Sequence, residues 1–185
     1  PPAQSVTVLA GPFMDSDGMD NPSGGCDVSV NGLNFGNGIN DDERLGLTGF
    51  IFWINTGPQH TYYARELYNR MKGLWADNSR IQFGGNGHVS DPRAVGPDCN
   101  FIFPGDSDPV NWGTGCVPPN PPYNQDGFYW TDSNTNIPGD RSGLGAMGPF
   151  SFEPGQVQEI ELAYCTANGW EGPVSSVVQL MENID

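Results

Sequence analysis

Basic residues are scarce in this chain. Lysine and arginine together number 7, against 22 aspartates and glutamates, which gives a formal net charge of -15 over 185 residues. Such a surface repels the phosphates of nucleic acids and the headgroups of anionic membranes. We therefore expect no nucleic-acid partner and no membrane insertion. A cationic ligand fits the charge, although the same acidity also serves solubility or salt adaptation.

Long apolar runs and known catalytic motifs are also missing. No stretch approaches the ~20 apolar residues that a membrane-spanning helix needs. The two histidines belong to no HExxH motif, and there is no GxSxG motif. A pair of carboxylates for glycoside hydrolysis, such as Asp42 and Asp106, stays open because only their separation in space would reveal it. The sequence favours a non-catalytic protein, with a hydrolase domain as a less favoured alternative.

Four cysteines are present, and none forms a CxxC pair. This pattern argues against a structural zinc site and a thioredoxin-type redox site. Disulfides fit better and indicate an extracellular location. Three pairings are possible. The closed loop between Cys99 and Cys116 has a size that gains stability from a staple, which favours Cys99–Cys116 and leaves Cys26–Cys165.

Turn-forming residues dominate the composition, with 26 glycines and 17 prolines. They favour a mainly β, loop-rich fold, β-sandwich or jelly-roll-like, with one packed α-helix near residues 61–75. The runs SVTVLAG and LTGFIFWIN are typical of strands, and a further strand is expected around residues 157–164. The length fits a single domain over residues 1–185.

The helix near residues 61–75 has the clearest pattern in the chain. Tyr63, Leu67, Met71 and Leu74 recur at helical spacing, and Thr61 is a candidate N-cap. We expect this stripe to pack into the core.

The tripeptide GPF occurs twice, at residues 11–13 and 148–150. It follows the first predicted strand and precedes the last, so we expect these strands to be neighbours in one sheet. The final residues, SSVVQLMENID, predict the first turns of a helix. Because the chain opens at Pro1 without a signal peptide, we expect a processed protein or a fragment of a longer multi-domain protein.

Acidic residues cluster at GPFMDSDGMDN, which places Asp15, Asp17 and Asp20 around Gly18. Calcium binds 6–8 oxygens at about 2.3–2.6 Å, and a short loop of carboxylates and carbonyls supplies them. The twelve-residue EF-hand frame is absent, and the nearer likeness is to short DxDGxD loops. The alternative is a solvated acidic turn with an Asx motif. Four later residues are expected to close the shell, and they are Asn40, Asp41, Asp42 and Glu43.

A second acidic loop carries Asp106 and Asp108 close to Trp112. It is either a further metal or ligand site, with Trp112 as a platform for stacking a sugar, or a proline-bounded turn, and the turn is favoured. The five tryptophans suggest a carbohydrate-binding module as an alternative function. Loss of glycan binding on substitution of Trp112 or Trp130 would support that alternative.

Several uncommon strings follow one another in a fixed order, namely GPFMDSDGMDN, FGNGINDDERLG, YYARELYNRMKGLWADN, FGGNGH, GPDCNFIFPGDSDPVNWGTG and GDRSGLGAMGPFSFEPGQVQEIELAY. Together they resemble a module of large secreted or surface proteins of Bacteroidota that the type IX secretion system exports. The resemblance implies an extracellular or cell-surface location and neighbouring modules in the same polypeptide. It implies no catalytic residues.

Combined, these observations predict a structural or adhesive module of a secreted or surface-anchored protein, with calcium as the cofactor that rigidifies its loops. The expected partners are neighbouring modules of the same polypeptide, with a glycan or a surface protein as a further candidate.

Overall fold

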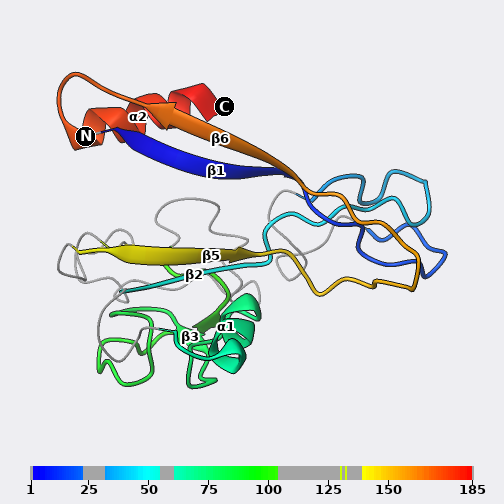
Figure 1. Ribbon diagram of the computed structural model, residues 1–185, viewed down its shortest axis with the longest axis horizontal. Coiled ribbons are helices and arrows are strands. Elements are labelled where there is room, and N and C mark those ends of the chain that lie inside the picture. Colours follow the sequence, from blue (N-terminus) through cyan, green and yellow to red (C-terminus); the bar gives the residue numbers. More distant parts are fainter. Residues whose placement is uncertain are drawn as a thin grey trace.

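The computed structural model of the chain describes residues 2–22, 32–54, 61–103, 130, 132 and 139–184. Strands outnumber helices and pair two by two in antiparallel sheets, β1 with β6, β2 with β5 and β3 with β4 (Figure 1). The predicted loop-rich, mainly β character is confirmed, whereas the part of the chain listed above forms no β-sandwich. The elements are β1 (Ala3–Ala10), β2 (Gly49–Ile54), α1 (Ala64–Met71), β3 (Ile81–Gln82), β4 (Asp98–Cys99), β5 (Arg141–Ala146), β6 (Glu161–Ala167) and α2 (Pro173–Ile184).

Strands β1 and β6 are neighbours, as the repeated GPF tripeptide predicted. Their register pairs Val6 with Tyr164 and Ser5 with Cys165. Helix α2, the predicted C-terminal helix, packs against both strands and buries Ser176 and Leu180. The two ends of the chain lie in this layer (Figure 1).

Strand β2 is the predicted buried strand LTGFIFWIN, and its partner β5 was not predicted. Gly143 and Gly145 interrupt β5 with residues that have low strand propensity. They also leave room for neighbours, because a Cβ at Gly143 would lie 3.2 Å from Cζ of Phe50. A core forms from seven buried residues, which are Ile51, Trp75, Ile81, Phe83, Cys99, Ile102 and Trp130.

Helix α1 lies inside the predicted range, but the predicted core stripe is wrong. Tyr63, Leu67 and Met71 are exposed, and the buried residues of the helix are Asn69 and Arg70. The spacing of the apolar residues predicts that they share one side of the helix, but it does not show that this side faces the core.

The predicted N-cap, Thr61, has a different role. The N-cap is Tyr63, and the Glu66 carboxylate accepts hydrogen bonds from the backbone N–H groups of Tyr62 and Tyr63. The hydroxyl oxygen of Thr61 accepts a hydrogen bond from Nε of Arg70 at 2.8 Å. Thr61 therefore positions a buried guanidinium.

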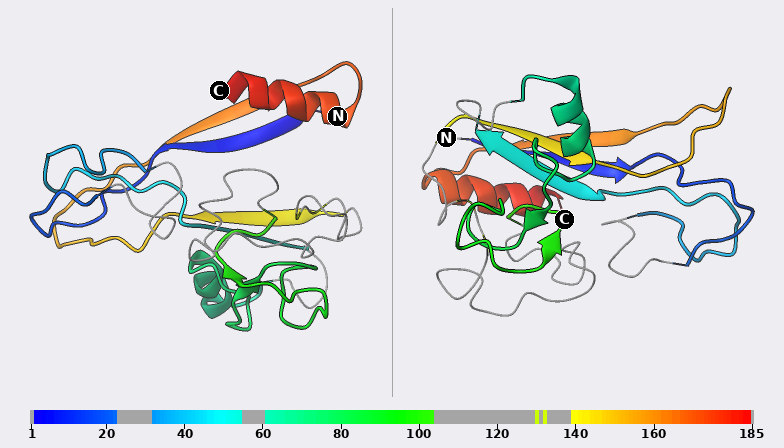
Figure 2. Two further views of the ribbon diagram at one scale, coloured as in Figure 1. Left: turned by 180° about the vertical axis from the view of Figure 1, so that it is seen from behind. Right: turned by 90° about the horizontal axis from the view of Figure 1, so that it is seen from below.

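Three segments, residues 11–22, 32–45 and 147–160, extend beyond the ends of the sheets and lie side by side (Figures 1 and 2). We call them the junction. The Met14 N–H donates to the Glu43 carbonyl at 3.0 Å, and the Ser151 N–H donates to the Met14 carbonyl at 2.9 Å. The Arg44 guanidinium adds bonds to backbone carbonyls of the first and third segments. These segments belong to the connections from β1 to β2 and from β5 to β6, and the first two carry the acidic residues of the predicted metal site.

Candidate metal centre

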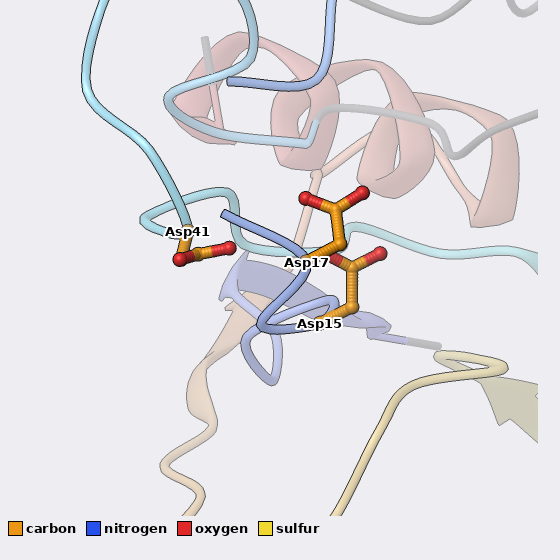
Figure 3. Close-up of side chains that lie close together, drawn as sticks. All are labelled: Asp15, Asp17 and Asp41. Atoms are coloured by element: carbon orange, nitrogen blue, oxygen red, sulfur yellow. The ribbon is translucent and has the colours of Figure 1, made fainter. Parts of the chain in front are cut away.

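Three of the predicted carboxylates meet in the junction. One oxygen each from Asp15, Asp17 and Asp41 lies within 4.8 Å of the other two. Asp15 and Asp17 stand side by side on the first segment, and Asp41 comes from the second (Figure 3). Because calcium binds oxygens at about 2.3–2.6 Å, oxygens up to about 5 Å apart can contact one ion. The group therefore has the geometry to hold a metal ion.

Local hydrogen bonds fold the first segment around Gly18. The Asp17 carboxylate accepts the Met19 N–H at 2.8 Å, which forms an Asx turn. Gly18 then adopts a positive φ of 80°, where a glycine avoids the strain of a side chain. Its N–H donates to the Asp41 carboxylate at 2.8 Å. The turn thus brings the two segments together through one of the candidate ligands.

Two further predicted ligands shape the loops. Both carboxylate oxygens of Asp20 accept backbone N–H groups, from Gly36 at 2.8 Å and from Gly38 at 2.6 Å. The Asn40 side-chain amide donates to the Gly18 carbonyl. Neither residue belongs to the three-carboxylate group found in the described part of the chain. Asp20 and Asn40 position the segments that carry Asp17 and Asp41.

Four buried acceptor oxygens in the junction have no hydrogen-bond donor among the described residues. They are Asp15 Oδ1, Asn21 Oδ1, Asp42 Oδ1 and Glu43 Oε2. Glu43 is the most enclosed, with 1% of its surface exposed. Its other carboxylate oxygen accepts the backbone N–H of Asn21.

Burying a carboxylate oxygen without a partner costs stability, commonly about 1–3 kcal/mol or more. A cation satisfies acceptor oxygens without a donor hydrogen. Asn21 did not belong to the predicted ligand set, although it directly follows Asp20 and its amide oxygen is a ligand type that calcium accepts.

Electrostatic repulsion also marks Asp15. Burial raises the pKa of the Asp15 carboxyl above its ordinary value, and the neighbouring charges of Asp17, Glu43 and Asp41 raise it further. A hydrogen bond from the Asp17 backbone opposes these effects without cancelling them. A bound cation would remove the repulsion by attracting all four carboxylates.

The second acidic loop, with Asp106, Asp108 and Trp112, lies outside the described residues. So do Cys26 and Cys116, and both predicted disulfides therefore stay predictions. Cys99 and Cys165, the two cysteines within the described residues, are not bonded to each other, and Cys99 is fully buried.

Trp130 is one of the two tryptophans considered for sugar stacking. It is 2% exposed, and its indole N–H donates to the Gly85 carbonyl at 2.9 Å. Its ring packs against Phe83 and Phe103 in the core. Trp130 therefore offers no stacking surface.

No protein-family model, curated protein or solved structure matches this chain. Among the helices of the described residues, none is long and apolar enough to cross a membrane.

Proposed function

We propose that this chain is a calcium-stabilised module with a structural or adhesive role in a secreted or surface-anchored protein. One observation carries the proposal, namely that the junction holds both the Asp15, Asp17 and Asp41 group and four buried acceptor oxygens without donors among the described residues. Evenly acidic surfaces are common, but buried acceptor oxygens without donors are costly, and a cation removes that cost.

Calcium suits this site better than other common metals. The available ligands are carboxylate and amide oxygens, and the cluster holds no histidine or cysteine, the ligands that zinc prefers. Calcium accepts irregular oxygen shells built from loops, whereas magnesium requires a nearly octahedral one.

The proposed role of the ion is to fasten the junction. Asp15 and Asp17 belong to the segment that follows β1, and Asp41 belongs to the segment that leads to β2. An ion bound to all three holds these segments together where the two larger sheets connect.

The proposal also covers the location of the module and its partners. The resemblance to type IX secreted proteins of Bacteroidota supports an extracellular location and neighbouring modules as partners. The described residues form sheets of two strands each. The finer form of the predicted fold, a complete β-sandwich or jelly roll, is therefore also only proposed.

Metal analysis by mass spectrometry, combined with thermal melts in calcium and in chelator, tests the calcium site. We expect bound calcium in the purified protein and a lower melting temperature after chelation. Asp17→Asn should lose most of this effect, whereas Glu182→Gln, an exposed carboxylate on α2, should keep it. A protein without metal and with an unchanged melt would contradict the proposal.

Neither alternative from the sequence gains support from a specific contact. The carbohydrate-binding hypothesis based on Trp130 is weakened because that ring is buried, and Trp112 lies outside the described residues. The acidic pair proposed for a hydrolase, Asp42 and Asp106, has one member outside them as well.

A further inference from the structure

Helix α2 exposes a row of apolar side chains along its length. Four residues make up this outer row, and they are Val174, Val177, Met181 and Ile184. Their exposed fractions are 77%, 49%, 57% and 38%. Because they recur at alternating intervals of three and four residues, they lie along one side of the helix. Two helices that pack along a common seam have apolar residues at this spacing.

Another side of α2 is already packed. Ser176 and Leu180 are buried where the helix contacts β1 and β6, and the Ser176 hydroxyl oxygen accepts the Gly169 N–H at 2.9 Å. Figures 1 and 2 show α2 alongside these two strands. A helix that is apolar around most of its circumference is normally buried on all those sides. The outer row therefore has the character of a contact surface that the described residues leave uncovered.

The charge around the outer row is negative. Strands β1 and β6 and helix α2 contain no lysine or arginine, whereas Glu171 and Glu182 are exposed near the two ends of the helix. A second copy of this chain would bring like charges together here, and its net charge of -15 would add to the repulsion. The charge therefore favours a basic partner over a second copy.

Glu182 gives a second reason to expect a basic partner. The carbonyl end of a helix carries partial negative charge, so an acidic side chain there is unfavourable and a basic one is favourable. Helix α2 has Glu182 in its last turn and no basic residue in that turn. A lysine or arginine from a partner would supply the positive charge that the helix itself lacks.

Helix α1 also exposes apolar side chains, but it carries basic residues of its own. Arg65 and Arg70 belong to this helix, and Lys72 is its C-cap. The ammonium nitrogen of Lys72 lies 5.0 Å from the centre of the Tyr68 ring. The exposed side of α1 therefore has no comparable need for a basic partner, and the helix provides a control for the experiment below.

We propose that the outer row of α2 pairs with an amphipathic helix of a partner protein, one that carries apolar residues at the same spacing and lysine or arginine beside them. The apolar residues of the two helices interdigitate, and the basic residues of the partner pair with Glu171 and Glu182. Trp170, which is 98% exposed and precedes Val174 by four residues, extends the contact at one end. Tryptophan is enriched in protein interfaces. This surface lies on α2 and does not use the carboxylates of the proposed calcium site.

A fluorescently labelled synthetic peptide serves as the probe. It is about three heptads long, with leucine at positions a and d and lysine at positions e and g, where like charges disfavour pairing of the peptide with itself. We expect fluorescence anisotropy to show binding that weakens at high salt, because exposed charges are screened. The same peptide with glutamate in place of lysine should not bind, since its charge matches that of α2.

Met181→Ser removes one apolar side chain of the outer row without changing the charge. It should weaken binding of the lysine peptide about tenfold, as expected for the loss of one well-packed contact. Met71→Ser is the matched control, because Met71 lies at the end of α1 and is 54% exposed, close to the value for Met181. It should bind the peptide as the unchanged protein does. Circular dichroism checks that both variants fold.

Several results would overturn the proposal. The first is no binding of the lysine peptide, the second is equal binding of the lysine and glutamate peptides, and the third is equal weakening by Met181→Ser and Met71→Ser. A dimer in sedimentation velocity that Met181→Ser dissociates would assign the outer row to a second copy of the chain. Binding to phosphatidylcholine vesicles that is lost in Met181→Ser would assign it to a lipid surface.

Discussion

At the scale of single residues, Gly11 determines how closely the first two segments of the junction approach. Its N–H donates to the Leu45 carbonyl at 2.8 Å, and a Cβ on Gly11 would collide with the same oxygen. The glycine of the second GPF, Gly148, is less crowded, since a Cβ there would lie 3.7 Å from Phe150.

Gly11→Ala is therefore expected to lower the free energy of unfolding by about 3 kcal/mol, because backbone atoms must move to relieve the collision. Gly148→Ala should cost less than about 1 kcal/mol. Urea denaturation of both variants measures the difference. Similar losses in the two would show that the close approach at Gly11 does not matter.

Asp15 gives the metal-free protein a distinctive pH dependence. Its pKa is raised in the folded state, so the fold binds this proton more tightly than the unfolded chain does and is penalised when Asp15 ionises. In chelator at pH 7, Asp15→Asn should melt at a higher temperature than the unchanged protein. The advantage should shrink as the pH falls through the raised pKa toward the ordinary value of 3.8.

In calcium the order should reverse, because the same variant then lacks a ligand of the ion. Differential scanning calorimetry across pH, with and without calcium, measures both effects. An Asp15→Asn variant that is less stable under all conditions would contradict the repulsion described for the metal-free site.

The sequence identified the acidic residues but could not divide their roles. Alternate spacing pointed to Asp15 and Asp17, which belong to the three-carboxylate group, because neighbouring carboxylates in a tight turn must share a ligand or repel. The spacing could not show that both carboxylate oxygens of Asp20 accept hydrogen bonds from the backbone N–H groups of Gly36 and Gly38. That contact joins segments 16 or more residues apart and depends on how the junction folds.

At the scale of elements, α1 shows a helix whose polar side is buried. Arg70 is 1% exposed, and its guanidinium lies over the rings of Trp53 and Trp75. The apolar spacing correctly predicted a helix but not its buried side, because two tryptophans outside the helix pack against a guanidinium and not against the aliphatic stripe. Neither tryptophan is recognisable as a partner from the helical sequence alone.

This arrangement predicts an unusual response to substitution. Arg70→Met keeps most of the side-chain volume but loses the ring contacts and the bond to Thr61, and should cost about 2 kcal/mol. Leu67→Gln and Met71→Gln should change stability by less than about 0.5 kcal/mol, since both side chains are exposed. Chemical denaturation of the three variants measures these values. A large loss of stability in Leu67→Gln and Met71→Gln would show that these two side chains do pack in the core.

The strands show a related division. β2 was predictable because GFIFWI is apolar and aromatic, whereas β5 reads RSGLGA and lacks strand-forming residues at its two glycines. These glycines accept the side chains of Phe50 and Leu47. A strand of this kind forms because it pairs with its partner strand, and its own sequence does not predict it.

At the scale of the whole molecule, the junction connects the β1–β6 layer with the β2–β5 layer (Figure 1). The pairing of β1 with β6 was predictable from a repeated tripeptide, but the arrangement of the layers was not. It depends on backbone bonds among three distant segments, such as those joining Met14 to Glu43 and to Ser151. The proposed ion adds to these bonds at the same place.

Removal of calcium should therefore loosen one region selectively. Hydrogen–deuterium exchange followed by mass spectrometry should show faster exchange in peptides covering residues 11–22 and 32–45, where the amides of Gly18, Gly36 and Gly38 bond to carboxylates. Peptides from β2 and β5 should keep their protection, because Ile51 and Leu144 are paired in the sheet and pack in or against the core. Asp17→Asn in calcium should reproduce the pattern of the chelated protein. Equal loss of protection in β2 and β5 would mean that the ion supports the whole fold. Unchanged exchange in every peptide would contradict the proposal that an ion binds in the junction.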